Sequence, residues 1–155
     1  MNETRRPDRL ARHTLRRAER ADAAGIGDVF LTARAGMDYL PRLHSDEQTR
    51  AWIAHVVLAE CEVWVAEADE RVVGFAALNG TWLDHLYVAP GRQGAGIGSA
   101  LLGRAMEAGA RDLRVFERNE AAARFYERHG FTVAGRGDGG DNEERLPDVH
   151  YRRNA

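Results

Sequence analysis

The sequence predicts an α+β fold, in which about seven strands form a sheet flanked by about four helices. Three apolar runs of strand length lie between residues 62 and 88, and the residues between them favour tight turns. Helix-like apolar spacing occurs both before residue 61 and after residue 96. The resulting order of elements, β-α-α-β-β-β-α-β-α-β-β, is typical of a sheet layered with helices.

The part of the chain before residue 61 predicts one short strand and two helices. The strand is expected over residues 14–18. Asp22 is a suitable N-cap for the first helix and Ser45 for the second. The apolar positions expected to be buried are Ile26, Val29, Phe30 and Ala33 in the first helix, and Trp52, Ile53, Val56 and Val57 in the second.

Residues 62–88 predict an antiparallel meander. Its strands are expected over residues 62–66, 72–78 and 81–88. The dipeptide Asn79-Gly80 between the last two runs is a strong hairpin signal, because both residues tolerate the positive φ angles of a tight turn. The meander leads directly into a glycine-rich loop.

After this loop the pattern alternates between helix and strand. A helix is expected from Ile97, with Gly109 as its end. A strand follows over residues 112–117, and then a second helix, which Asn119 caps and Gly130 ends. Two final strands are expected over residues 131–137 and 148–153.

Length and composition narrow the class of protein. With 155 residues, the chain is expected to form one domain over residues 13–155, after a flexible polar segment over residues 1–12. The net charge of −2 gives no general basic field, so neither nucleic acid nor a membrane is an expected partner. There is no metal-ligand spacing, no secretory signal and no long apolar run, which predicts a cytoplasmic protein without a metal.

The loop "GRQGAGIGS", residues 91–99, predicts an anion-binding site. It joins a strand to a helix, and a helix N-terminus offers unpaired amides and the positive end of the helix dipole. Glycines there let a phosphate approach the backbone closely. No Lys-Ser/Thr pair follows, and Ser99 stands where a dinucleotide-binding loop needs its third glycine, so both common nucleotide patterns fail.

The residues Gln93-Gly94-Ala95-Gly96-Ile97-Gly98 match the Q/R-x-x-G-x-G/A signature of the GNAT superfamily of acyl-CoA-dependent N-acyltransferases, which the chain resembles. A second match, N-x-x-A-x-x-F-Y-x-x-x-G-F, runs from Asn119 to Phe131. The two motifs occur in the family's order, and the resemblance covers roughly residues 13–152. It implies the GNAT fold, a mixed and mostly antiparallel central sheet, and an N-acetyltransferase that uses acetyl-CoA as its acyl donor.

The resemblance also implies which residues hold acetyl-CoA. Amides of the glycine loop would bind the pyrophosphate, and the strand before the loop would make main-chain contacts with the pantetheine arm. Asn119 would meet the pantetheine side, although capping its own helix is an equally good reason for its presence. The implied cofactor-binding residues are Leu86, Tyr87, Val88, Arg92, Gln93, Gly94, Ala95, Gly96, Ile97, Gly98, Ser99 and Asn119.

For the chemistry, the resemblance makes Tyr126 the proton donor to the departing thiolate. The preferred base is Asp84, with His85 as an alternative, and Asp84 could instead bind the substrate ammonium without moving a proton. Strict strand alternation puts Asp84 on one face with Trp82, Leu86 and Val88, and His85 on the other with Leu83 and Tyr87.

The acceptor is expected to be a small-molecule amine or a peptide amino group. In the family its pocket comes from the loops at residues 35–47 and 137–148, and the second loop here is rich in acidic residues. Those acids could favour a cationic amine or form only a solvated turn. The alternative function is a non-catalytic regulatory module that binds acyl-CoA. The resemblance also allows a homodimer, since GNAT proteins commonly dimerise, but nothing in the sequence identifies an interface.

Overall fold

The computed structural model describes residues 13–154, so the predicted flexible segment 1–12 lies outside the described residues. Seven strands form one mixed sheet in the order β1-β2-β3-β4-β5-β7-β6. Only β4 and β5 are parallel; every other neighbouring pair is antiparallel. The strands are β1 Thr14–Arg17, β2 Glu62–Ala68, β3 Arg71–Asn79, β4 Trp82–Val88, β5 Asp112–Phe116, β6 Phe131–Gly137 and β7 Asp148–Arg153.

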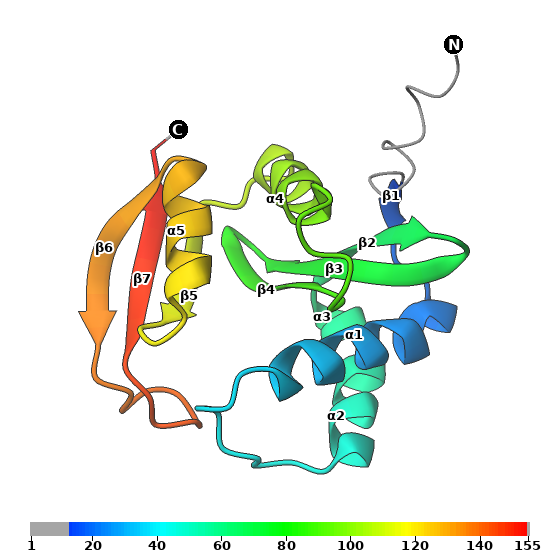
Figure 1. Cartoon of the computed structure of the whole chain (residues 1–155), viewed down its shortest axis with the longest axis horizontal. Coiled ribbons are helices and arrows are strands. Elements are labelled where there is room, and N and C mark those ends of the chain that lie inside the picture. The colour runs from blue at the N-terminus through cyan, green and yellow to red at the C-terminus, as the bar shows by residue number, and fades with distance from the viewer. Residues whose placement is uncertain (1–12, 155) are drawn as a thin grey trace.

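The helices cover both faces of the sheet (Figure 1). They are α1 Ala23–Ala35, α2 Asp46–Trp52, α3 Leu58–Glu60, α4 Ile97–Glu107 and α5 Glu120–Arg128. A π-helical turn, Ile53–Val57, joins α2 to α3, so that these segments form one rod. Within residues 13–154 no helix combines the length and apolar character that crossing a bilayer requires. The predicted α+β sheet flanked by helices is confirmed.

Two apolar clusters hold the layers together. One joins α4 and α5 to the sheet and includes Leu101, Leu102 and Phe131. The other joins α1 and the π-helical turn to the opposite face and includes Ile26 and Ile53. Burial of apolar surface on each face of the sheet stabilises this three-layer arrangement by about 25 cal/mol for each Å² removed from water.

A local start signal explains where α2 begins. The Ser45 hydroxyl accepts from the Gln48 amide at 3.0 Å, while the Gln48 side chain accepts from the Ser45 amide at 2.9 Å, which is a complete capping box. Asp22 differs from its prediction. Its carboxylate accepts two hydrogen bonds of 2.9 Å from the Arg16 guanidinium and one of 2.7 Å from the Glu19 amide, and makes no capping bond to α1.

The prediction that Val56 is buried was wrong. The π-helical turn inserts one residue into the helical repeat, which rotates Val56 outward to 37 % exposure. The same turn leaves Ile53 and Val57 buried, and Trp52 packs edge-on against Phe30 of α1.

Candidate active site

The glycine loop presents a row of free backbone amides. The Arg92 amide donates to the Ala89 carbonyl at 3.0 Å, and the Ala100 amide donates to the Gly96 carbonyl at 3.0 Å. Between them, in the described structure, no amide from Gln93 to Ser99 donates to a protein acceptor. These amides surround the N-terminus of α4, where the helix dipole is positive. The geometry is therefore that of an anion-binding cradle.

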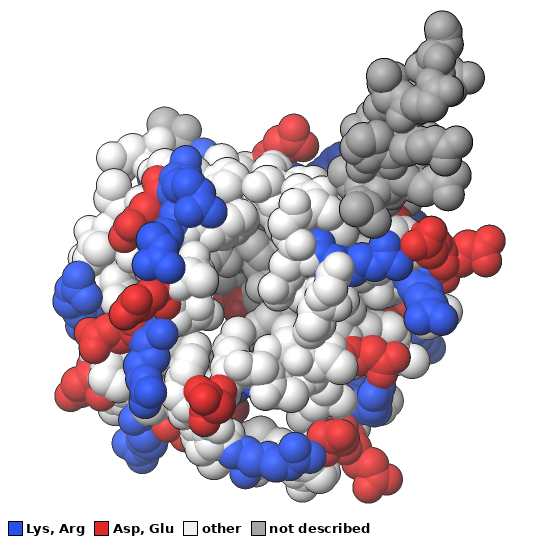
Figure 2. All heavy atoms as spheres, viewed as in Figure 1, with Lys and Arg blue, Asp and Glu red and all other residues white. Residues whose placement is uncertain are grey.

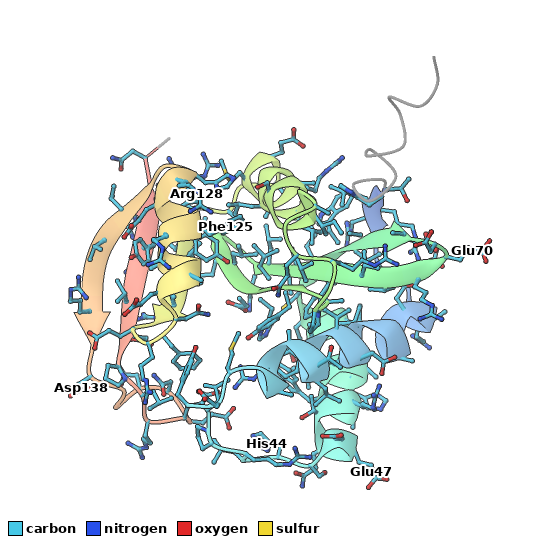
Figure 3. The ribbon with its side chains drawn as sticks, in the orientation of Figure 1. His44, Glu47, Glu70, Phe125, Arg128 and Asp138 are labelled. Carbon is cyan, nitrogen blue, oxygen red and sulfur yellow. The ribbon has the colours of Figure 1, made fainter. Side chains whose placement is uncertain are left out.

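Glycine conformation gives the cradle its shape. Gly94 and Gly96 have φ angles of 85° and 83°, and a Cβ on either would meet no atom within 4 Å, so this side of the cradle is open. Gly98 lies against its floor: a Cβ there would stand 3.6 Å from the Phe125 ring and 3.7 Å from the Val88 side chain. Figure 3 shows Phe125 pointing from α5 toward α4.

Arg92 is not free to bind an anion without a change of partner. Its guanidinium donates to the exposed Asp69 carboxylate at 2.8 Å. Such exposed ion pairs are weak, so an incoming phosphate can compete for this side chain. The Gln93 amide group reaches back to the Val88 carbonyl at 3.4 Å.

Strands β4 and β5 separate just below the cradle. They pair only at Trp82 with Asp112 and Leu83 with Leu113. From His85 to Val88, β4 keeps β3 as its neighbour but has no partner on its β5 side. Backbone groups on that side are available to a ligand that lies along the strand. The expected contact residues Leu86, Tyr87 and Val88 all belong to this unpaired stretch.

Tyr126 lies on α5 and is 8 % exposed. Its ring packs edge-on against Phe125 and Phe131, at centroid distances of 5.1 and 5.8 Å. No hydrogen bond to its hydroxyl is found in the described part of the chain. Burial, together with the neighbouring Tyr87, raises the pKa of Tyr126 well above its ordinary value. The phenol therefore stays protonated at neutral pH and has a proton to donate.

Asp84 occupies a bulge, which corrects the predicted strand faces. Ala77 pairs with His85 and Leu78 with Leu83, so Asp84 is the extra residue on β4. Leu83 consequently packs in the α4–α5 cluster, whereas the His85 ring packs toward α1, and the two do not share a face. The prediction from strict alternation was wrong because the inserted residue, Asp84, moves the side chains of the preceding β4 residues to the opposite face of the sheet.

The bulge places Asp84 in a hollow of about 430 Å³, which Trp82, Leu83, His85 and Arg114 also line. Burial raises the pKa of the Asp84 carboxyl above its ordinary value. A carboxylate with a raised pKa is a better proton acceptor than a solvated one. Figure 2 shows a hollow near the centre of the viewed face, while most of the charged side chains lie toward the edges of that face.

His85, the alternative base, is held in an aromatic cage. Rings of Phe30, Trp52, Phe75 and Tyr87 surround it at centroid distances between 5.3 and 6.4 Å. Burial and the Arg34 charge lower the pKa of His85 to about 4. The imidazole is thus neutral at pH 7 and only weakly basic, which makes it a poorer proton acceptor than an imidazole in water.

Two loops approach each other: residues 36–45 between α1 and α2, and residues 138–147 between β6 and β7 (Figure 1). His44 Nε2 lies 2.7 Å from a carboxylate oxygen of Glu143, and the Arg34 guanidinium donates a hydrogen bond to the Glu144 carboxylate at 3.0 Å. Arg34 also donates to the Tyr87 hydroxyl at 3.2 Å. Two acids of the loop that was expected to meet the acceptor or face solvent therefore have protein partners: Glu143 joins the two loops, and Glu144 joins its loop to α1.

Arg34 was missed by sequence reasoning. Its carboxylate partner, Glu144, lies 110 positions away, so no local pattern signals the pair. Asn119 caps its own helix, which was one of the two roles expected for it: its side-chain oxygen accepts a hydrogen bond from the Ala122 amide at 3.1 Å. Within residues 13–154 no group of three metal-ligating side chains comes together.

Comparison with known proteins matches residues 59–133 to the family described as "Acetyltransferase (GNAT) domain". Among curated proteins, the peptidyl-lysine N-acetyltransferase YjaB of Escherichia coli is 37 % identical over 92 residues, which span 58 % of this chain and 63 % of YjaB. The aligned part is thus less than two thirds of that relative.

Solved structures resemble the chain over more of its length. The solution structure of apo YjaB superposes with a TM-score of 0.74 and 26 % identity, covering 91 % of this chain and 97 % of YjaB. YncA of Salmonella typhimurium, assigned as an acetyltransferase and solved with its cofactor acetyl-CoA, superposes with a TM-score of 0.66 and 25 % identity, covering 90 % of this chain and 91 % of YncA.

Proposed function

The chain belongs to the GNAT acetyltransferase family, and from that premise we propose that it transfers the acetyl group of acetyl-CoA to the side-chain amine of a peptidyl lysine. The observation that carries the proposal is the row of unbonded amides from Gln93 to Ser99 beside the unpaired stretch of β4. The lysine acceptor is suggested by the similarity to YjaB.

In this proposal the free amides and the dipole of α4 bind the coenzyme pyrophosphate, with Arg92 turning from Asp69 to add a charge. The unpaired main chain of Leu86, Tyr87 and Val88 aligns the pantetheine arm. Phe125 closes the floor of the cradle under Gly98. The whole of residues 13–155 acts as one catalytic domain.

In the reaction the acceptor nitrogen loses two protons and the sulfur gains one. A lysine amine is mostly protonated at pH 7, so Asp84 accepts a proton before the nitrogen attacks the thioester carbonyl. As the new C–N bond forms and the C–S bond breaks, the electron pair of the C–S bond leaves on sulfur, and Tyr126 donates its proton to that thiolate. The nitrogen then loses its second proton, which returns to the Tyr126 phenolate through solvent, while Asp84 releases the first proton to water. A main-chain amide near Val88 stabilises the oxyanion that forms between these steps.

A second candidate, a regulatory module that binds acyl-CoA without turnover, would need only the cradle. A protonated tyrosine buried in the α4–α5 apolar cluster and a carboxylate in the hollow along β4 favour the enzyme, since mere binding uses neither.

The test is release of free thiol from acetyl-CoA in the presence of lysine peptides, for the wild type, Tyr126→Phe and Asp84→Asn. Tyr126→Phe is expected to lower kcat by ~10²–10⁴-fold, the range for loss of a general acid. Coenzyme A affinity should stay unchanged. Stability should also stay nearly unchanged, because the lost hydroxyl has no hydrogen bond within the described protein.

Tyr151→Phe is the matched control, since Tyr151 is buried in the same apolar cluster but its hydroxyl donates to Glu127 at 2.8 Å. It should lose stability and keep its kcat. Wild-type turnover by Tyr126→Phe would remove Tyr126 from the mechanism. Coenzyme A binding without turnover on any amine would favour the regulatory module.

A further inference from the structure

The hollow that contains Asp84 also contains a guanidinium. Arg114 lies on β5 and lines this hollow together with Asp84. Building on the proposed function, we propose that the acceptor amine is accompanied by a carboxylate, which Arg114 binds while Asp84 receives the amine. Arg114 is then a specificity-determining residue, and the preferred acceptor is a lysine with an acidic group beside it.

Arg114 is available to a ligand. Its side chain is 55 % exposed, and the nearest carboxylate, on Asp148, lies 4.0 Å from it, at the outer limit of an ion pair. That carboxylate is also 3.4 Å from the Asn142 side-chain amide, which donates to it. Because the guanidinium is half exposed and the separation is long, this pair contributes little, so a substrate carboxylate can compete with Asp148 for Arg114.

The guanidinium is nevertheless held in place. It lies 5.1 Å from the centre of the Trp82 ring, in a cation–π contact. Trp82 stacks in turn on His150 at 4.8 Å, and His150 Nε2 lies 2.9 Å from the buried Asp112 carboxylate. This chain of contacts fixes Trp82 as a platform, so Arg114 loses little freedom when it binds an anion.

Two acids of the loop between β6 and β7 already have partners. Glu143 pairs with His44, and Glu144 pairs with Arg34. A further guanidinium, that of Arg118, lies over the Tyr39 ring at 5.3 Å and has no carboxylate within ion-pair distance among the residues the structure describes. Among the residues that line the hollow, Arg114 supplies the positive charge beside Asp84.

This charge pattern matches a zwitterionic acceptor better than a purely cationic one. An amine with no anion nearby would be repelled by Arg114 as well as attracted by Asp84. The carboxylate has two sources: an acidic residue next to a peptidyl lysine, or the α-carboxylate of a free amino acid. Both present the same chemistry to Arg114, and substrate pairs can separate them.

The experiment compares kcat/KM for substrate pairs that differ only in the anion. The first pair is a peptide with Glu next to its lysine and the same peptide with Gln there; the second is lysine and lysine carboxamide. Charge-assisted hydrogen bonds predict at least about tenfold preference of the wild type for the anionic member of one pair. The pair that shows the preference identifies the source.

Arg114→Gln should bring that ratio close to one, and Arg114→Glu should reverse it in favour of a peptide with Arg next to the lysine. Arg124→Gln is the control, because Arg124 is an exposed arginine of α5 that does not line this hollow. It should keep the wild-type ratio. Because each ratio is measured within one variant, partial unfolding cannot imitate the result.

A wild-type ratio near one for both pairs, or a ratio that survives in Arg114→Gln, would overturn the inference while leaving the acetyltransferase intact. No turnover with any of these acceptors would overturn the proposed function, and this inference with it.

Discussion

The caged imidazole of His85 makes stability depend on pH. Its pKa is about 4 in the folded protein, against 6.5 for an ordinary histidine. Because the unfolded chain binds the proton more tightly, stability is fully present above pH 6.5 and falls as the pH drops toward 4. The difference between 6.5 and about 4, at 1.36 kcal/mol per unit, makes the full loss about 3 kcal/mol.

The perturbation that isolates this effect is His85→Phe, which keeps a ring among Phe30, Trp52, Phe75 and Tyr87 but cannot titrate. The free energy of unfolding of the variant is subtracted from that of the wild type at each pH. Other titrating groups, including the neighbouring Asp84, occur in both proteins and largely cancel. The difference should be constant above pH 7 and shift by about 3 kcal/mol in favour of the variant by pH 4.

The assay is urea unfolding followed by tryptophan fluorescence, from pH 8 to the lowest pH at which the protein folds. His55→Gln is the control, because His55 is an exposed histidine on the π-helical turn. The difference curve of His85→Phe should change with pH more than that of this control. A flat curve for His85→Phe would show that the imidazole keeps its ordinary pKa, and would restore His85 as a base of ordinary strength.

Two further predictions concern single backbone positions. Gly96→Ala should lower the free energy of unfolding by about 1–2 kcal/mol, because alanine must adopt a φ of 83°, and it should weaken coenzyme A binding. Gly103→Ala, in the open middle of α4, should raise the free energy of unfolding by about 0.5–1 kcal/mol and leave coenzyme A binding unchanged. Equal effects of these two on binding would argue against the cradle. Asn119→Ala should lower the free energy of unfolding by about 1 kcal/mol, measured by thermal or urea unfolding. Asn119→Ser should keep most of the wild-type stability, because serine can also cap α5. Equal stability of the two variants would argue against capping.

Local signals explain why so much of the fold could be predicted. Asn79-Gly80 does connect β3 to β4, and the Ser45 and Asn119 caps begin helices where expected. Each of these signals acts through neighbours in the sequence, so it can be recognised without knowing the tertiary structure.

The features that were missed depend on tertiary contacts. The bulge at Asp84 and the π-helical turn at Ile53–Val57 each insert one residue into a regular repeat, and the repeat itself contains no sign of the insertion. The Arg34–Glu144 pair joins segments that only the folded chain brings together. The cradle was predictable because its glycines and its helix are consecutive in sequence, whereas the acceptor side is assembled from distant segments.

The most direct measurement of the central claim is a backbone-amide NMR titration with coenzyme A. The amides from Gln93 to Ser99 have no protein acceptor in the described structure, so binding should give them one. We expect these signals to shift most and their hydrogen exchange to slow when coenzyme A is added. Binding that leaves these amides unchanged, or no binding at all, would contradict the assignment of the loop as the pyrophosphate cradle.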